Sequence, residues 1–114
     1  MSKAKLEVGL KRAAPVFAAL GDELRLSLVV RLGSEGPLSI ASLTSGTRVT
    51  RQAVTKHLHV LEDAELVRAS RSGRERHWEV RAARLSEAQR CLELIAQRWD
   101  DALARLKRAV EDEE

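Results

Sequence analysis

The chain has 114 residues, of which 44% are apolar, 32% charged and only 3% aromatic, and its formal net charge is +3. This length predicts one soluble globular domain, and the scarcity of aromatic side chains argues against a β-sandwich and against an RNA surface built on base stacking. A single cysteine cannot form an internal disulfide, and no apolar run is long enough for a signal peptide or a membrane span, so we expect a cytoplasmic protein with no membrane partner.

The charge is distributed unevenly along the chain. Residues 48–84 contain nine Arg and Lys against five Asp and Glu, whereas residues 85–114 contain five against eight. The basic surface therefore belongs to the middle of the chain, and a polyanionic partner would be attracted there first.

The N-terminal residues predict two amphipathic helices. Apolar residues recur at steps of four and three, as in a helix packed against another helix; they are Leu6, Leu10, Ala13, Phe17 and Leu20. Because proline disrupts a helix interior, Pro15 predicts that the regular helix begins near residues 13–15. Asp22 then caps a second helix over residues 23–32, and residues 33–37 form a turn.

A short helix followed by a longer one comes next. Ser39 caps a helix over residues 40–45, Gly46 ends it, and Thr50 caps a helix over residues 50–65. On a helical wheel the longer helix divides into two arcs. The polar arc contains Arg51, Gln52, Thr55, Lys56, His59, Glu62 and Asp63, and the opposite arc contains Ala53, Val54, His57, Leu58, Val60, Leu61 and Ala64.

This pattern is typical of a helix-turn-helix, although similar helix pairs occur in proteins that never contact nucleic acid. The cationic, amide and hydroxyl groups lie in the first turns of the longer helix, and the carboxylates lie in the last. Arg, Gln, Thr and Lys side chains can hydrogen-bond base edges in the major groove or the neighbouring phosphates. Our hypothesis is that residues 50–65 form a DNA recognition helix.

A basic hairpin follows this helix. Residues 66–70 and 76–80 are predicted strands, and residues 71–75 contain the Gly and polar residues of a hairpin loop. Four arginines occupy this hairpin, a density that costs self-repulsion unless phosphates neutralise it; they are Arg68, Arg71, Arg74 and Arg76. The alternative is a solvated basic surface, but beside a helix-turn-helix the pattern favours a DNA-binding wing.

The last helix is predicted over residues 85–109. Its apolar residues follow a heptad pattern; they are Leu85, Ala88, Leu92, Ile95, Trp99, Ala102, Leu106 and Ala109. This stripe is longer than the core of so small a domain requires, which predicts that it contacts a second copy of the chain in a homodimer. The alternative is that it only covers the first helix of its own chain.

Histidine spacing does not predict a metal site. His57 lies on the apolar arc and is expected to be a core residue bonded to a backbone group, whereas His59 faces the polar arc and can contact phosphate. Together with His77 they do not have a recognisable metal-ligand spacing.

Three other side chains have alternative roles. Cys91 flanks the heptad stripe as a small packing residue, or as a redox-sensing thiol paired across the dimer. Trp99 fills the dimer core, or walls a small-molecule pocket. Trp78 is expected to anchor the hairpin to the body.

The order of these elements resembles the ArsR-type family of bacterial winged helix-turn-helix repressors over residues 16–110. VFAALGDELRLSLVVRL is similar to the family's opening helices, VTKHLHVLEDAELV to its recognition helix and turn, and SGRERHWEV to its wing. The resemblance implies a dimer joined through its first and last helices, with two recognition helices in successive major grooves of an imperfect inverted repeat. It also implies repression by occlusion of a promoter.

Two departures from the family pattern matter. Where many members have Ala-Gly-Leu-Val after the recognition helix, this chain has Glu65 in the Gly position, so we expect strain of roughly 1 kcal/mol or an altered helix exit. Metal-sensing members have a Cys-x-Cys pair in the recognition region or His and Asp ligands on the last helix. Residues 43–56 contain no Cys and residues 85–109 contain no His, so no metal or cofactor site is carried over.

The prediction is a mainly α protein with a small β-hairpin, a winged helix-turn-helix that dimerises through its N- and C-terminal helices. Residues 1–114 form one domain, with flexible ends at 1–9 and 111–114. The expected DNA contacts are Arg48, Thr50, Arg51, Gln52, Thr55, Lys56, His59, Arg71, Arg74 and Arg76. The expected dimer interface is Phe17, Leu85, Ala88, Leu92, Ile95, Trp99, Ala102 and Leu106.

No phosphate-binding Gly loop and no nucleophile-base spacing is present, so an enzyme is not expected. The competing hypothesis is a winged-helix domain that contacts another protein and has no specific DNA binding.

Overall fold

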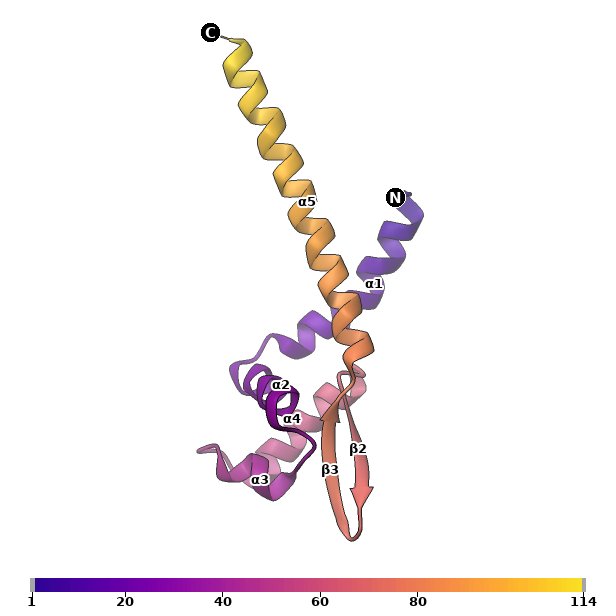
Figure 1. Ribbon diagram of the computed structural model, residues 1–114, viewed down its shortest axis with the longest axis vertical. Coiled ribbons are helices and arrows are strands. Elements are labelled where there is room, and N and C mark those ends of the chain that lie inside the picture. Colours follow the sequence, from indigo (N-terminus) through magenta and orange to yellow (C-terminus); the bar gives the residue numbers. More distant parts are fainter. Residues whose placement is uncertain (1, 114) are drawn as a thin grey trace.

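The computed structural model describes residues 2–113, which form five helices and three short strands (Figure 1). In chain order they are α1 (Lys3–Leu20), α2 (Glu23–Glu35), β1 (Leu38–Ser39), α3 (Ile40–Ser45), α4 (Arg51–Asp63), β2 (Val67–Ser72), β3 (Glu75–Val80) and α5 (Ala82–Asp112). Met1 and Glu114, the outermost residues of the two ends expected to be flexible, lie outside the described residues. Flexibility of the remaining end residues stays a prediction.

The first helix is longer than its sequence predicted. The expectation that it begins near residues 13–15 is wrong, because α1 runs from Lys3 through Pro15, with Ser2 capping its start by accepting a hydrogen bond from the Lys5 N–H at 3.2 Å. Pro15 lies on the exposed side of α1, so water can bind the carbonyl that loses its intrahelical donor. Burial of Ala13, Val16 and Ala19 on the opposite side of α1 offsets the cost of the missing hydrogen bond.

The second helix begins where predicted and ends later. The Asp22 carboxylate accepts a hydrogen bond from the Arg25 N–H at 3.0 Å, and this bond lowers the pKa of Asp22. The predicted end at residue 32 is wrong, because α2 continues through Gly33 to Glu35 and is capped by Gly36, whose N–H donates to the Leu32 carbonyl. One Gly inside a helix is therefore not sufficient to stop it when the preceding turn is buried at Leu28, Val29 and Leu32.

The sheet is antiparallel, with strand order β1–β3–β2. The predicted hairpin is confirmed, with strands that extend to Ser72 and from Glu75, so that Gly73 and Arg74 form a tight turn and Gly73 has φ of 65°. The third strand, β1, was not predicted, because two residues are too few to show alternation. It pairs Leu38 with Trp78 and thereby attaches the hairpin to the segment before α3.

The four helices α1, α2, α3 and α4 and the base of the hairpin share one apolar core. Its largest fully buried side chains are Trp78, Leu28, Leu43, Leu58, Leu61, Leu66, Val16, Val54 and Val67. Trp78 therefore anchors the hairpin to the body, as expected. Each such aliphatic side chain contributes about 1.5–3 kcal/mol by its removal from water, so α4 and the hairpin are held in one orientation relative to each other.

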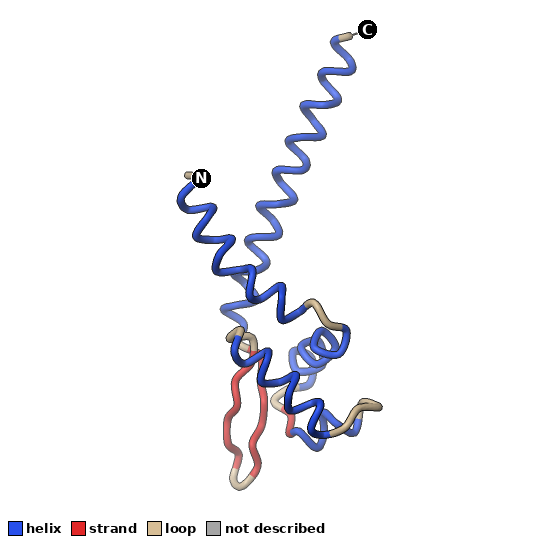
Figure 2. Tube along the Cα trace, turned by 180° about the vertical axis from the view of Figure 1, so that it is seen from behind, coloured by secondary structure: helices blue, strands red, loops and turns tan. Residues whose placement is uncertain are grey.

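The last helix projects away from the body (Figures 1 and 2). It has 31 residues, and only Ala88 is buried among those described. α1 packs across the first turns of α5, and the outer half of α5 extends beyond the rest of the chain. Within residues 2–113 no helix combines the length and apolar character that a membrane crossing needs.

Candidate nucleic-acid interface

The helix-turn-helix is built as its capping residues predicted. The Ser39 hydroxyl accepts from the Ser42 N–H at 3.2 Å at the start of α3, and the Thr50 hydroxyl accepts from the Ala53 N–H at 3.1 Å at the start of α4. Val54, Leu58 and Leu61 bury one face of α4 in the core. The opposite face is consequently presented outward along the whole helix.

The side chains on the polar arc of α4 differ in how free they are to contact a ligand. Arg51, Gln52 and Lys56 are exposed, and the side chains of all three make no hydrogen bond or ion pair with any described residue. The Thr50 hydroxyl is engaged as the cap, and the half-buried Thr55 hydroxyl donates to the Arg51 carbonyl at 2.9 Å. The groups most available to a ligand are therefore a guanidinium, an amide and an ammonium in the first turns of one helix, whose N-terminus itself favours anions.

Val60 corrects one detail of the helical wheel, whereas His59 is exposed as its place on the polar arc predicted. Val60, assigned to the apolar arc, is 37% exposed and lies at the edge of the buried stripe. His59 is half-exposed, with Nδ1 3.2 Å from Glu62 Oε1 and its ring edge-on to the buried Trp78 ring at 5.8 Å between centroids. His59 thus lies between the recognition helix and the base of the hairpin.

His57 is half-buried, but its partner is not the backbone group that was expected. Its Nδ1 lies 3.3 Å from Arg25 Nη1 and 3.9 Å from Asp22 Oδ2. Arginine can only donate, so the shorter contact requires Nδ1 to accept and places the ring proton on Nε2. His57 therefore belongs to a polar contact between α2 and α4, made possible because it lies at the rim of the core.

The hairpin arginines fall into two groups. Arg68 is neutralised by Glu79, with Nε 2.6 Å from Oε1, so it contributes less free charge than the sequence suggested. Arg71 and Arg76 face each other across the β2–β3 ladder, and Arg74 occupies the turn at the hairpin tip. All three are exposed, and Arg76 also lies 5.1 Å from the centroid of the Trp78 ring. Like charges directly opposite in a ladder are unfavourable unless an anion lies between them.

Arg48 is exposed in the connection between α3 and α4. It precedes the first turn of α4, so its guanidinium extends the same basic region. Exposed basic side chains thus occur on the polar face of α4, at Arg48 and at the hairpin tip, and side chains of this kind bind phosphate backbones.

Of the two alternatives for the end of α4, the structure has the left-handed conformation at Glu65 and not an altered helix exit. Glu65 has φ of 61° and is the one non-Gly residue with positive φ among those described. Its N–H donates to the Glu62 carbonyl, and the Leu66 N–H donates to the Leu61 carbonyl, both at 2.9 Å. This is the hydrogen-bond pattern that usually places Gly in the left-handed position.

The apolar stripe of α5 is covered at one end and uncovered at the other. Ala88 is buried within the chain, and Phe17 and Leu85 pack partly against the same core. Ala102 is half-buried and Ile95 partly exposed, whereas Leu92, Trp99 and Leu106 are 53%, 66% and 62% exposed. Further exposed apolar side chains that the heptad did not include are Val8 and Leu10 on α1 and Leu103 and Val110 on α5.

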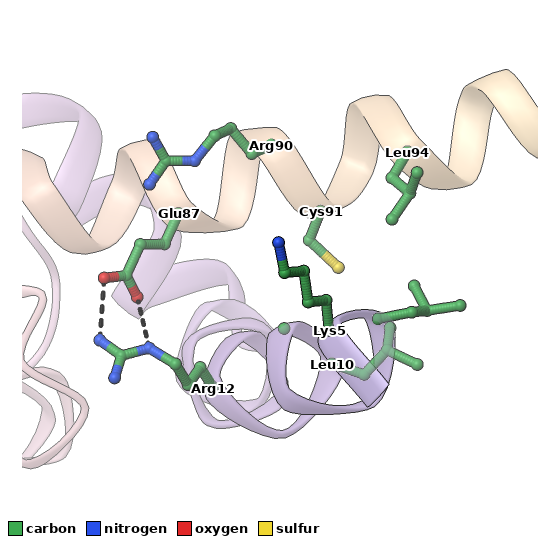
Figure 3. A pocket seen from close by; sticks show the side chains of 9 residues that line it. Lys5, Leu10, Arg12, Glu87, Arg90, Cys91 and Leu94 are labelled. Atoms are coloured by element: carbon green, nitrogen blue, oxygen red, sulfur yellow. Dashed lines mark hydrogen bonds and ion pairs between the residues drawn. The ribbon is translucent and has the colours of Figure 1, made fainter. Parts of the chain in front are cut away.

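A groove of about 290 Å³ separates α1 from α5. Figure 3 shows Cys91 directed into it, facing Lys5 and Leu10, so this thiol faces α1 of its own chain. The Arg12–Glu87 ion pair closes the inner end of the groove. Among residues 2–113 no three His, Cys, Asp or Glu side chains are grouped to hold a metal ion.

Two arginines that sequence reasoning missed connect helices beneath the candidate interface. Arg25 Nε donates to the Ala19 carbonyl at 2.6 Å, which ties α2 to the end of α1. Arg84 contacts α1, the end of α4 and a neighbouring turn of α5. No local pattern identifies either residue, because their partners lie up to 72 residues away along the chain.

Comparisons with known proteins agree with this architecture. Residues 20–69 match a helix-turn-helix domain family. The uncharacterized HTH-type transcriptional regulator YuzN of Bacillus subtilis (strain 168) is 40% identical, over 54% of this chain and 73% of that protein. Among solved structures, an ArsR-like transcriptional regulator from Rhodococcus sp. RHA1 is 39% identical with a TM-score of 0.75, covering 86% of this chain and 92% of that one.

A homodimeric winged helix-turn-helix DNA-binding domain from Mycobacterium bovis, Mb0332, shares the fold with a TM-score of 0.61 at 22% identity, over 92% of this chain and 93% of that one. The winged helix-turn-helix fold that the sequence resemblance implied is thus confirmed by similarity to a solved structure with that fold. With an exposed polar recognition helix, a basic wing and these relatives, the chain belongs to the ArsR-like family of winged helix-turn-helix, DNA-binding transcriptional regulators.

Proposed function

We propose that this regulator is a homodimeric repressor, which binds an inverted-repeat operator with one α4 helix in each of two successive major grooves and thereby occludes the promoter. The two helices would then lie about 34 Å apart, one turn of B-DNA. The proposed DNA contacts are Arg48, Thr50, Arg51, Gln52, Thr55, Lys56, His59, Arg71, Arg74 and Arg76.

The observation that supports this proposal most directly is the exposed first half of α4. Arg51, Gln52 and Lys56 extend from a helix whose other face is fully packed, and no described side chain partners them. A long polar side chain that is left without a partner at a helix N-terminus can hydrogen-bond base edges and phosphates. The opposed Arg71 and Arg76 on the wing provide a second anion-binding region beside it.

The dimer is supported by the uncovered stripe of α5. Leu92, Trp99 and Leu106 remain exposed, because no other part of residues 2–113 covers them. Large exposed apolar faces mark contact sites, and a heptad stripe pairs most readily with another helix of the same kind. The proposed interface is Phe17, Leu85, Ala88, Leu92, Ile95, Trp99, Ala102 and Leu106.

In this proposal the protein works in the cytoplasm by binding alone, without a cofactor and without catalysis. Arg51 and its neighbours would read bases, while the arginines of the wing would hold the phosphate backbone. Affinity should therefore fall steeply with salt, because each neutralised phosphate releases counterions.

The decisive experiment is a selection from random duplexes, followed by a shift assay on the selected sequence and light scattering on the free protein. We expect an inverted repeat with half-sites about 10 base pairs apart and a mass twice that of one chain. Repression would then be measured by transcription in vitro from a promoter that contains the selected site. Failure to enrich any sequence at low salt would favour a module that contacts another protein, and a monomer at micromolar concentration would exclude the dimer.

A further inference from the structure

The exit of α4 is held by a side chain from another element. Glu65 adopts the left-handed conformation, with φ of 61°, at the point where the recognition helix turns into the wing. L-residues with a side chain rarely adopt this conformation unless surrounding contacts hold it. The two backbone hydrogen bonds that close this turn are supplemented by side-chain contacts from a second element.

Arg84, in the first turn of α5, supplies those contacts. Its Nε donates to the carbonyl of Ala64, the C-cap of α4, at 3.4 Å and lies 3.6 Å from Glu65 Oε2. Its Nη2 donates to the Arg12 carbonyl on α1 at 3.0 Å, and its Nη1 donates to Glu87 Oε2 at 2.8 Å. All three guanidinium nitrogens are engaged, and the side chain is only 13% exposed.

Glu87 connects the same junction to α1. Its carboxylate also accepts from Arg12, with Oε1 2.9 Å from Nη2 and Oε2 3.4 Å from Nε, as Figure 3 shows. These two guanidinium groups hold the pKa of Glu87 below its usual range, so the carboxylate remains charged. Arg84 thus joins the end of the DNA-reading helix to the two helices of the proposed dimer interface.

Arg84 is too far from Arg51 and Gln52, at the start of α4, to act on their DNA contacts through its charge. From Arg51 to Ala64 the helix axis advances about 20 Å at 1.5 Å per residue. Exposed charges are largely screened beyond about 10 Å at ordinary salt. An effect of Arg84 on the DNA contacts of Arg51 and Gln52 must therefore pass through the geometry of α4.

We infer that Arg84 is a positioning residue for DNA recognition: it holds Glu65 in the left-handed turn and so sets the direction of α4 relative to α1, α5 and the wing. The inference rests on the proposed function, in which α4 reads the operator. A planar guanidinium satisfies three acceptors at fixed angles, which the single ammonium of lysine cannot do. Arg84→Lys therefore removes the positioning while it retains the charge.

The experiment compares Arg84→Lys with wild type on the selected duplex and on an unrelated duplex at equal salt. We expect specific affinity to fall about tenfold, as for loss of one charge-assisted hydrogen bond, while affinity for unrelated DNA stays within about twofold. Arg90→Lys, an exposed arginine on the same helix with no partner among the described residues, is the matched control and should change neither.

A second variant tests the route through Glu65. In a Glu65→Gly background the left-handed turn no longer needs support, so Arg84→Lys should reduce the specific affinity much less than it does in wild type. Equal losses in both backgrounds would overturn the inference, as would an equal loss on specific and unrelated DNA or no loss at all. If Arg84→Lys fails to fold, Glu87→Gln, which weakens one Arg84 hydrogen bond and the Arg12 ion pair, replaces it with the same expectations, and Arg12→Gln, which removes that ion pair alone, is its control.

Amide hydrogen exchange separates this inference from the proposed function. Arg84→Lys should accelerate exchange at the Glu65 and Leu66 amides, which close the end of α4, whether or not DNA is present. If wild type enriches no duplex, the proposed function fails, and unchanged exchange at these two amides would overturn the positioning role independently.

Discussion

Arg51 and Gln52 are the first two residues of α4. Both side chains are exposed, and neither has a partner among the described residues. We expect Arg51→Ala or Gln52→Ala to weaken binding to the selected duplex by about 1–3 kcal/mol, because one bidentate contact to a base edge is lost. Competition shift assays against single-base variants of the site would show whether the loss is confined to particular base pairs. An equal loss on every sequence would contradict a base-reading role.

Arg74 provides a contrast to Arg51 and Gln52, because it lies in the turn at the tip of the wing and not on α4, the helix proposed to read bases. Arg74→Ala should weaken binding to all sequences alike and reduce the slope of log affinity against log salt by about one. The measurement is a salt titration of wild type and variant on two duplexes. A change in base preference would show that Arg74 reads sequence after all.

Glu87 makes the stability of the α1–α5 contact dependent on acid. Hydrogen bonds from Arg12, and then from Arg84, lower its pKa in the folded chain below the ordinary value of 4.5. The contribution of Glu87 to the free energy of unfolding is therefore complete above pH 4.5, and it is lost as the pH falls through the lowered pKa. Glu87→Gln cannot titrate, so its melting temperature should fall less than that of wild type between about pH 5 and about pH 3. Parallel thermal unfolding curves for the two proteins over that range would contradict this assignment.

At the scale of elements, the two glycines at the end of α2 have opposite roles. Gly33 lies inside the helix with open space where a Cβ would be, whereas a Cβ on Gly36 would meet the Leu32 carbonyl oxygen. Gly33→Ala should raise the free energy of unfolding by about 0.5–1 kcal/mol, since alanine restricts the unfolded chain and favours the helix.

Gly36→Ala should instead lower the free energy of unfolding, by about 1–3 kcal/mol, because backbone must move to accommodate the added methyl group. Chemical denaturation of both variants at equal protein concentration measures the two effects. A stabilising Gly36→Ala would mean that the cap relaxes freely and that the end of α2 is not determined by this close approach.

At the scale of the whole molecule, α5 packs against α1 of its own chain and, in the proposed dimer, against a second chain. Its first turns pack on α1 through Ala88, while Trp99, further out, is 66% exposed and contributes nothing to the core of its own chain. Trp99→Glu should therefore leave the fold of the single chain intact but place two carboxylates against each other in the proposed dimer. We expect a monomer by light scattering and a loss of operator affinity of about a hundredfold or more, because the two half-sites are no longer bound together.

Ala104→Glu is the matched control for this prediction. Ala104 is exposed on the side of α5 that faces away from the heptad stripe, so the same new charge should leave the dimer unchanged. If Ala104→Glu also gives a monomer, the helix is sensitive to charge in general. If Trp99→Glu remains a dimer with full affinity, the interface lies elsewhere.

Most of the local structure could be predicted from the sequence, because it depends on residues within a few positions of one another. Ser39 and Thr50 cap their helices by bonding to N–H groups three residues later, and the alternation of polar and apolar residues assigns the faces of α4. The left-handed turn was one of two alternatives expected at Glu65, because the family resemblance places Gly there. The long stripe on α5 follows from a heptad period that is visible without coordinates.

Tertiary structure decided what depends on residues far apart in the chain. Because α1 packs on the core, it continues as a helix past Pro15. Pairing with β3 makes residues 38–39 a strand, although they are only two residues long. Glu79 neutralises Arg68 and leaves the basic wing to Arg71, Arg74 and Arg76. Arg84 reaches Arg12 across 72 positions, so no local pattern could assign it to the exit of the recognition helix. The sequence by itself determined which helix face and which hairpin have the polar and basic side chains proposed to contact DNA, and only the assembled core determined how these two elements are oriented.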